Sequence, residues 1–358
     1  PAIISGSLGY LIVVVGMVAT GMIGCDLGLA SCTCCQAGFG KSGARFIVST
    51  IFAVNMIGWF GIQNGVCGEA FSNAMLAMTG WDIPVVVSNT IWGIIMLLTA
   101  VYGVHALEKL DKISIPLLMI IMCYGIFLAF KVYGTGNLND EGTVQSMSFM
   151  SGVALSFNFT AVGTITGPDY TRFQKSRKDT VKSVFYGVFP MGVITLIMGI
   201  VLTKLSGQYD ISMVLIEVGL PLLGIIALVI STWTTNSTNA YSAGLNIVMA
   251  LKLKDNRRRE ATLISGIVGI VLCDLGILGH VEGVLSLLSY VVCPVGGVIL
   301  ADYWVVGKGK AKNFRPQDGV NWAGVIAWAL GAIISYTLVK IEFVGIIIGF
   351  VIYLIAEH

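Results

Sequence analysis

Long apolar stretches separated by short charged segments run along the whole chain. Residues 84–104, 181–202 and 214–233 contain few charged residues or none, and about 20 apolar residues in a helix cross the ~30 Å hydrocarbon core of a bilayer. The pattern predicts an all-α polytopic membrane protein, with residues 1–358 forming a single transmembrane domain. We expect about eleven helical spans, at residues 2–23, 46–72, 84–104, 113–134, 149–168, 181–204, 214–250, 262–279, 283–305, 320–339 and 341–356.

Charged residues are scarce. The 358 residues include 21 Lys or Arg and 19 Asp or Glu, so 11% are charged, whereas a soluble domain carries about 25%. Hydrophobic residues make up 56% of the chain and the mean hydropathy is +0.88. This composition excludes a water-soluble domain and makes the lipid bilayer an expected partner. The net charge of +2 is divided among the connections, so no basic face is available for nucleic acid.

The basic residues indicate how the spans are oriented. Eighteen of the 21 Lys and Arg residues fall in alternate connections, which leaves Lys131, Lys204 and Lys340 on the other side. Because cytoplasmic connections carry an excess of Lys and Arg, we expect a cytoplasmic C-terminus in the cytoplasmic or inner membrane. Eleven spans then place the N-terminus outside. The chain begins at Pro1 with no signal peptide, so we expect at least one missing upstream helix; a complete eleven-span protein is the alternative.

The eight cysteines are expected to be reduced. Five lie in or beside apolar spans, where a thiol behaves as a small hydrophobic group. Cys32, Cys34 and Cys35 cluster in the first cytoplasmic connection, but they have neither a nearby His nor the paired spacing of a zinc site. We therefore expect ordinary thiols there and no metal centre.

Polar residues at mid-membrane depth are informative, because each costs free energy unless it faces a cavity or a partner. Trp59 lies 14 residues after Arg45, which is about 21 Å along a helix. Gln63 follows four residues later, on the same helix face. The pair offers a flat apolar surface beside an amide that donates and accepts hydrogen bonds, which suits a planar heteroaromatic ligand. Packing between helices is the alternative for both residues.

The fifth predicted span contains residues that weaken a helix. Gly163 and Gly167 precede Pro168, and proline removes a backbone hydrogen bond. Asn158 and Phe159 lie just before them. We expect a discontinuous helix here, because secondary transporters bind substrates at such breaks. Alternatively, Pro168 simply ends the helix at the cytoplasmic surface.

Residues 233–241 place an unusual number of polar side chains inside an apolar span. Thr235, Thr238 and Asn239 share one helix face, so their oxygens converge there. Oxygen ligands suit a small monovalent cation. Each threonine hydroxyl could instead bond to the preceding turn of its own helix, although this does not account for Asn236 and Asn239.

The remaining polar groups favour transport of a neutral compound. Charged residues within the spans are few, and the acidic residues Glu69, Glu217, Asp274 and Glu282 lie near external ends. A charged substrate would ordinarily meet a countercharge at mid-depth. The three histidines lie in loops or at ends without a Glu or His at a useful spacing, so we expect neither an enzyme nor a cofactor. An intramembrane enzyme and a passive channel are the alternatives from other classes.

At these positions the chain resembles the cytosine permease branch of the nucleobase–cation symporter family. The resemblance rests on five segments in the family's order: WFGIQ at 59–63, PDYTRF at 168–173, WTTN with NAYSAGL at 233–236 and 239–245, PVGGVILADY at 294–303, and VNW at 320–322. It implies a LeuT-type architecture of two inverted five-helix repeats plus two C-terminal helices. On that plan, residue 1 lies at the start of the family's second helix.

The resemblance also implies roles for individual residues. Trp59 looks like the residue that stacks on the nucleobase, and Gln63 is similar to the amide that bonds its edge. The second stacking aromatic is either Phe159 or Phe157, because this chain has Thr160 where the family's aromatic usually falls. By the same resemblance, Thr234 and Thr235 look like hydroxyl ligands of sodium, with the other ligands on the family's first helix, and Asn239 resembles a further contact to the base.

We therefore expect cation-coupled import of a neutral nucleobase, with cytosine or a related purine or pyrimidine as the first candidate. The alternative is the same architecture carrying another small neutral heterocycle, such as a hydantoin, allantoin or a vitamin. The sequence leaves open which base is carried, whether Na⁺ or H⁺ is the coupling ion, and the oligomeric state.

Overall fold

The structure, a computed structural model, describes residues 1–102, 104–135, 147–207 and 211–357. Within these ranges it is helical and contains no strand. The main α-helices are α1 Ala2–Leu27, α2 Ser31–Cys34, α3 Gln36–Gly43, α4 Ser49–Thr79, α5 Val85–Tyr102, α6 Val104–Tyr133, α7 Phe149–Thr160, α8 Gly163–Thr171, α9 Arg177–Ser206, α10 Ile211–Glu217, α11 Pro221–Ala250, α12 Arg258–Asp274, α13 Val281–Leu300, α14 Trp322–Ile334 and α15 Val344–Glu357. Eight helical segments of the described chain are long and apolar enough to cross a membrane.

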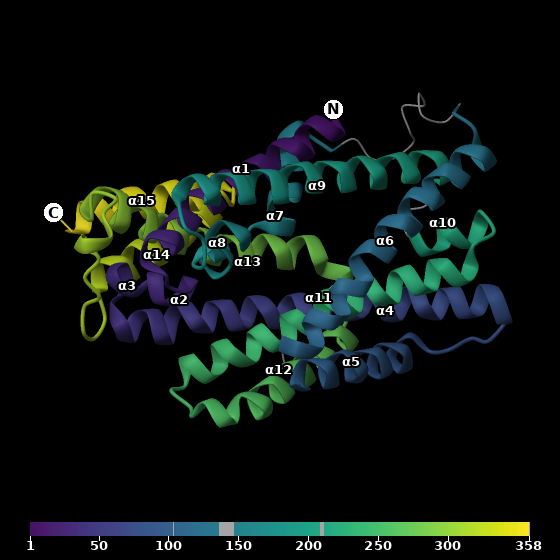
Figure 1. Ribbon diagram of the computed structural model, residues 1–358, viewed down its shortest axis with the longest axis horizontal. Coiled ribbons are helices and arrows are strands. Elements are labelled where there is room, and N and C mark those ends of the chain that lie inside the picture. The colour runs from purple at the N-terminus through teal and green to yellow at the C-terminus, as the bar shows by residue number, and fades with distance from the viewer. Residues whose placement is uncertain (103, 136–146, 208–210, 358) are drawn as a thin grey trace.

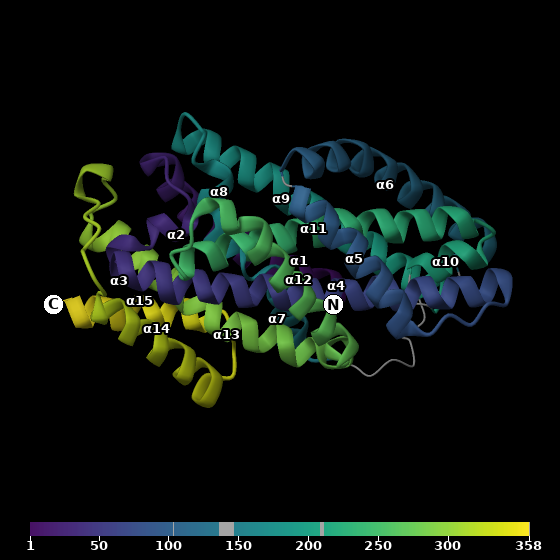
Figure 2. The same ribbon diagram turned by 90° about the horizontal axis from the view of Figure 1, so that it is seen from below.

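The helices form two layers that face each other (Figure 1). One layer contains α4, α5, α11 and α12, and the other contains α1, α7, α8 and α9. Helix α13 lies between them and packs against α14 and α15 near the C-terminus. Figure 2 shows α6 on one side of α4, with α14 and α15 on the other. Residues from both layers can therefore meet along the surface between α4 and α7.

Three of the predicted spans are each interrupted by a break. In range 262–279, α12 ends at Asp274 and Gly276 takes a left-handed φ of 88°. Range 214–250 contains the end of α10 and all of α11, because Gly219 takes a left-handed φ of 86° and Pro221 begins α11. Range 149–168 contains α7 and most of α8, with the break at residues 161–162.

The residues expected to break the fifth span have different positions in the structure. Gly163 is the first residue of α8 and borders the break, whereas Gly167 and Pro168 lie inside α8, which continues to Thr171. A Cβ at Gly167 would lie 2.5 Å from the carbonyl oxygen of Met17 on α1, and a Cβ at Gly24 of that helix would lie 2.4 Å from the Cα of Pro168. Gly167 and Pro168 therefore do not form the break. They belong to the close contact between α8 and α1, which glycine permits because it has no side chain.

The cysteine cluster belongs to the packed core. Cys32, Cys34 and Cys35 are buried together with Phe39 and Val298 in one hydrophobic cluster. Burial raises the pKa of the Cys32 thiol to about 11 and that of Cys34 to about 12, because a thiolate is poorly stabilised away from water. These thiols are therefore neutral and unreactive at physiological pH.

An ion pair joins three elements at the end of the molecule that holds the C-terminus. Arg177 at the start of α9 donates from Nε to both carboxylate oxygens of Asp26 on α1, at 2.9 Å each. Its Nη2 donates to the carbonyl oxygen of Gly309 at 2.6 Å, and Tyr303 Oη donates to Asp26 Oδ2. The end of α1, the start of α9 and the segment after α13 are thus held together.

Candidate substrate-binding site

Trp59 and Phe159 face each other across the two layers. Trp59 lies on α4 and Phe159 lies near the end of α7, and their ring centroids are 6.0 Å apart with an interplanar angle of 50°. Trp59 is half-buried, whereas Phe159 is 49% exposed. The indole therefore points toward the interior of the molecule, and the phenyl ring has room to turn.

Two further groups at this position lack a hydrogen-bond partner within the described residues. Gln63 lies one turn after Trp59 on α4, and its half-buried amide is unpaired. Thr160 is the last residue of α7, and its buried Oγ1 is also unpaired. The amide of Gln63 is therefore available to the donor and acceptor groups of a planar ligand beside Trp59, whereas Thr160 points about 100° away from Phe159 on α7.

Phe157, the other candidate for the second aromatic, points elsewhere. It is fully buried and packs edge-on against Phe343, with ring centroids 5.6 Å apart. It shares a cluster with Val13 of α1 and Cys293 of α13. Phe159, and not Phe157, is the ring that lies opposite Trp59.

Asn158 is directed away from these rings. Its Nδ2 donates to Oε1 of Glu342 at 3.0 Å, and its buried Oδ1 has no partner in the described structure. Adjacent helical residues point about 100° apart, so Phe159 faces α4 while Asn158 faces the connection between α14 and α15. Asn158 therefore does not face Trp59 itself and adjoins the site only because it is next to Phe159 in the chain.

The polar residues of α11 differ in their hydrogen bonds. Asn236 is fully buried and donates to the carbonyl oxygen of Phe60 on α4 at 3.1 Å, while Ser237 donates to the carbonyl oxygen of Met96 on α5 at 3.0 Å. These two residues hold the layer together. Asn239 is only half-buried, and its Nδ2 lies 3.5 Å from Asn236 Oδ1, so most of its hydrogen-bonding capacity remains available.

The threonines proposed as cation ligands, Thr234 and Thr235, immediately precede Asn236 on α11. Thr234 Oγ1 donates to the carbonyl oxygen of Ser231 at 3.0 Å, the backbone contact typical of a helical threonine. This bond uses the hydroxyl proton and leaves the oxygen lone pairs available to a cation. Thr235 is exposed.

Comparison with known proteins identifies the family. Residues 2–356 match the family described as "Permease for cytosine/purines, uracil, thiamine, allantoin". The chain belongs to this family.

Two characterised permeases illustrate the relationship. The cytosine permease of Escherichia coli K12 is 31% identical over 335 residues, which cover 92% of this chain and 76% of that protein. The allantoin permease of Bacillus subtilis 168 is 24% identical over 397 residues, which cover 96% of this chain and 81% of that protein. The first relative confirms the cytosine permease branch expected from the sequence motifs.

A solved structure shows the same fold. Mhp1, a nucleobase-cation-symport-1 family transporter in a closed conformation with bromovinylhydantoin bound, matches with a TM-score of 0.80 and 18% identity. The match covers 99% of this chain and 84% of Mhp1. The permease therefore has the all-α, LeuT-type membrane fold that the sequence predicted.

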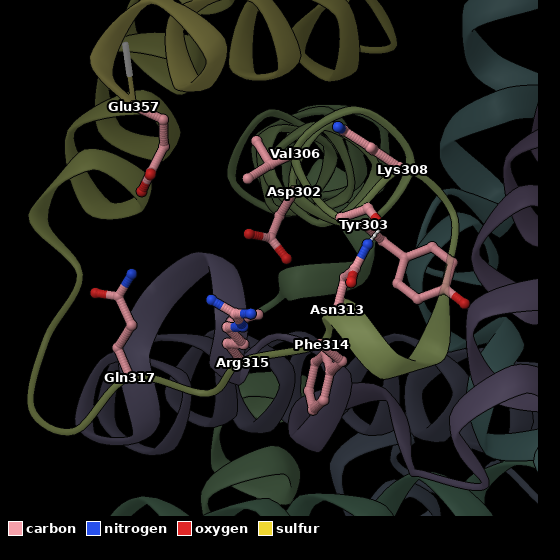
Figure 3. A pocket seen from close by; sticks show the side chains of 11 residues that line it. Asp302, Tyr303, Val306, Lys308, Asn313, Phe314, Arg315, Gln317 and Glu357 are labelled. Atoms are coloured by element: carbon pink, nitrogen blue, oxygen red, sulfur yellow. Dashed lines mark hydrogen bonds between the residues drawn. The ribbon is translucent and has the colours of Figure 1, made fainter.

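The permease also has a polar cavity near its C-terminus. It measures about 360 Å³ and lies at the ends of α13 and α15. Figure 3 shows Asp302, Glu357 and Arg315 directed into this space. None of the residues expected to bind the substrate lines it. Its mixture of charged groups differs from the uncharged rings and amides at Trp59.

Sequence reasoning did not identify Glu342 as a neighbour of the site. This carboxylate is only 6% exposed, although it lies in the short connection between α14 and α15. One signal was present, because Glu342 stands between the apolar residues Ile341 and Phe343. Its contact with Asn158 joins residues 184 positions apart, which no local pattern reveals.

Proposed function

We propose that this permease imports a neutral nucleobase together with a cation, and that cytosine is the first candidate substrate. The observation that carries the proposal is the placement of Trp59 opposite Phe159, with the free amide of Gln63 one turn away. Membership of the cytosine, purine and allantoin permease family supports the same assignment. The protein is thus a transporter of the membrane, and not an enzyme.

The substrate site is proposed to include five residues. Trp59 and Phe159 stack on the two faces of the base, because aromatic rings favour offset or tilted contact with flat π-systems. Gln63 and Asn239 bind its edge through side-chain amides, which both donate and accept hydrogen bonds. Asn158 positions Phe159 from the next place in α7.

Thr234 and Thr235 are proposed to ligate the coupling cation. Their hydroxyl oxygens support Na⁺, and H⁺ is the alternative. Ion binding would favour the outward-open conformation, in which the base site is formed. Each ligand shifts the conformational equilibrium only by its difference in affinity for the two states.

We further propose that the permease lies in the cytoplasmic or inner membrane with its C-terminus in the cytoplasm. The ion pair of Arg177 and Asp26 and that of Lys41 and Asp318 support this topology. Both join connections that carry the clustered basic residues, so these connections lie at one end of the molecule. A reporter fused to the C-terminus that is active only in the cytoplasm tests the orientation.

The decisive experiment measures uptake of radiolabelled cytosine by cells that express the full-length protein, including any sequence that flanks residues 1–358. Trp59→Ala and Gln63→Ala are expected to reduce uptake strongly. Trp322→Ala is the control, because Trp322 is 67% exposed and lies outside the site. If Trp59→Ala and Gln63→Ala transport like the wild type, the site assignment is wrong.

Two further arms define the substrate and the ion. Unlabelled uracil, adenine, allantoin and a hydantoin compete with labelled cytosine, and stronger competition by a non-nucleobase would favour the alternative substrate class. Replacement of Na⁺ by N-methylglucamine abolishes Na⁺-coupled uptake, whereas a protonophore abolishes H⁺-coupled uptake.

A further inference from the structure

A buried carboxylate lies directly behind the proposed base site. Glu342 is 6% exposed, and its Oε1 accepts hydrogen bonds from Asn158 Nδ2 at 3.0 Å and from Ser286 Oγ. The two donors lie on α7 and α13, while Glu342 itself lies between α14 and α15. Three separate parts of the chain therefore meet at one ionisable group.

Within the described residues, no basic side chain forms an ion pair with this carboxylate. Lys340 is close in sequence but exposed. The titratable groups near Glu342 are Tyr290 and Cys293 on α13, and neither carries a positive charge. Burying a charged carboxylate without a countercharge costs free energy. The two donors at Glu342 are both neutral, so they would offset only part of a negative charge there.

The amide of Asn158 supplies a second, independent indication of a ligand. Asn158 is 7% exposed, and its Oδ1 has no hydrogen-bond partner among the described residues. Asn158 Nδ2 donates to Glu342, so the unsatisfied Oδ1 belongs to the same amide group that contacts the carboxylate. A cation bound at Glu342 would take this oxygen as a ligand once the amide turned over.

We propose that Glu342, Asn158 and Ser286 form a binding site for a monovalent metal cation, with Na⁺ as the first candidate. A carboxylate, an amide oxygen and a hydroxyl are the hard oxygen ligands that such ions prefer. The site is distinct from Thr234 and Thr235, which lie on α11. This cation site extends the proposed function. Only its coupling to base binding depends on that function being correct.

The position of the site predicts how cation and base are coupled. Asn158 immediately precedes Phe159, so a cation that draws Asn158 toward Glu342 also fixes the ring that faces Trp59. By linkage, the cation increases base affinity by the same factor as the base increases cation affinity. The cation here acts on the rotation of α7 and not on the base directly.

The test measures binding of ²²Na⁺ to purified full-length protein without any base. Binding is compared in a Thr234→Ala/Thr235→Ala background, which removes the other proposed cation site. This background is expected to retain saturable Na⁺ binding. Adding Glu342→Gln is expected to weaken that binding by at least about tenfold, since loss of even an outer-shell partner costs about 10- to 100-fold in metal affinity. Glu342→Asp keeps the charge and is expected to retain part of the binding.

Glu282→Gln is the matched control, because Glu282 is an exposed carboxylate at the start of α13. It is expected to bind Na⁺ like its parent. Ser286→Ala keeps all charges and is expected to weaken binding severalfold, so it tests the site if Glu342→Gln fails to fold. Thermal unfolding in NaCl and in N-methylglucamine chloride provides a second measurement, in which Na⁺ stabilises only variants that bind it.

Unchanged Na⁺ binding after Glu342→Gln overturns the proposal. It is also overturned if that variant alters only the pH dependence of cytosine binding, since Glu342 would then bind a proton and no metal ion. Failure of the wild type to bind or transport any base would refute the proposed function alone. The ²²Na⁺ measurement contains no base and would still decide whether the cation site exists.

Discussion

Replacement of Phe159 by alanine provides the sharpest test of the base site. In the structure, the Trp59 and Phe159 ring centroids are 6.0 Å apart and tilted by 50°. A flat base between two parallel rings needs about 3.5 Å on each side, or roughly 7 Å in total. The rings must therefore separate by roughly 1 Å and become more nearly parallel, and the more exposed Phe159 is the ring that we expect to turn.

Loss of the Phe159 ring removes one of two stacking contacts. Stacking of a base on an aromatic side chain contributes about 1–3 kcal/mol, which corresponds to roughly 5- to 150-fold in Kd. We expect Phe159→Ala to weaken cytosine binding within this range. Phe159→Tyr keeps a flat ring and should bind nearly as tightly as the wild type.

Equilibrium binding of tritiated cytosine to purified full-length protein measures the effect. Phe173→Ala is the matched control, because Phe173 is 78% exposed at the end of α8 and contacts neither ring. Thermal unfolding measured on each variant separates loss of binding from loss of folding. Phe159→Ala should leave the melting temperature nearly unchanged, since the side chain is already half exposed.

Replacement of Phe157 by alanine should affect stability rather than base binding. Its ring is fully buried against Phe343, so Phe157→Ala should destabilise the protein by about 3–5 kcal/mol. If Phe159→Ala binds cytosine within twofold of the wild type, while a folded Phe157 variant loses binding, the ring opposite Trp59 is not the second stacking partner. The assignment based on ring geometry would then be refuted.

Three further predictions concern packing, the ion pair and the thiols. Gly167→Ala should destabilise the protein by about 1–3 kcal/mol, because its Cβ would lie 2.5 Å from a backbone oxygen of α1; Gly187→Ala, with nothing within 4 Å, should unfold at nearly the wild-type temperature. Arg177→Gln should lower the free energy of unfolding by about 1 kcal/mol. This is less than a buried charged hydrogen bond contributes, because the Arg177 side chain is 40% exposed. An unchanged melting temperature would contradict this prediction. Cys32 should resist iodoacetamide at pH 8, where an introduced Lys254→Cys reacts. The neutral Cys32 thiol should stabilise the fold below pH 9, and this contribution should be lost between pH 9 and about 11. Rapid labelling of Cys32 at pH 8 would show that its thiol is not buried.

The membrane fold was predictable because its signal is local and repeated. Each span carries its own apolar stretch, so the all-α membrane class followed from residues read one segment at a time. The LeuT-type arrangement came only from the resemblance of the motifs to the family. The break between α7 and α8 was less predictable. It falls at Ala161 and Val162, which have no helix-breaking chemistry, while Gly167 and Pro168 fit the surface of α1.

The candidate site was predictable only in part. Trp59 and Gln63 share a helix face, and that face is fixed by helical geometry alone. The sequence could not show which polar residues of α11 pack the helix and which could bind a ligand. Asn236, for example, donates to the carbonyl oxygen of Phe60, 176 residues away in the chain. Glu342 was missed for the same reason. A polar residue at mid-depth indicates that a partner exists, but not which distant segment provides it.

If the proposed base and cation sites are correct, these contacts would connect them. Asn236 and Ser237 fasten α11 to α4 and α5, so Trp59 belongs to a well-connected layer. Helix α7 is different, because a two-residue turn at Ala161 and Val162 separates it from α8. It carries Phe159 toward one layer and Asn158 toward Glu342. A rotation of α7 that brings Phe159 parallel to Trp59 must therefore change the geometry between Asn158 and Glu342, and a ligand on either side of the helix acts on the other.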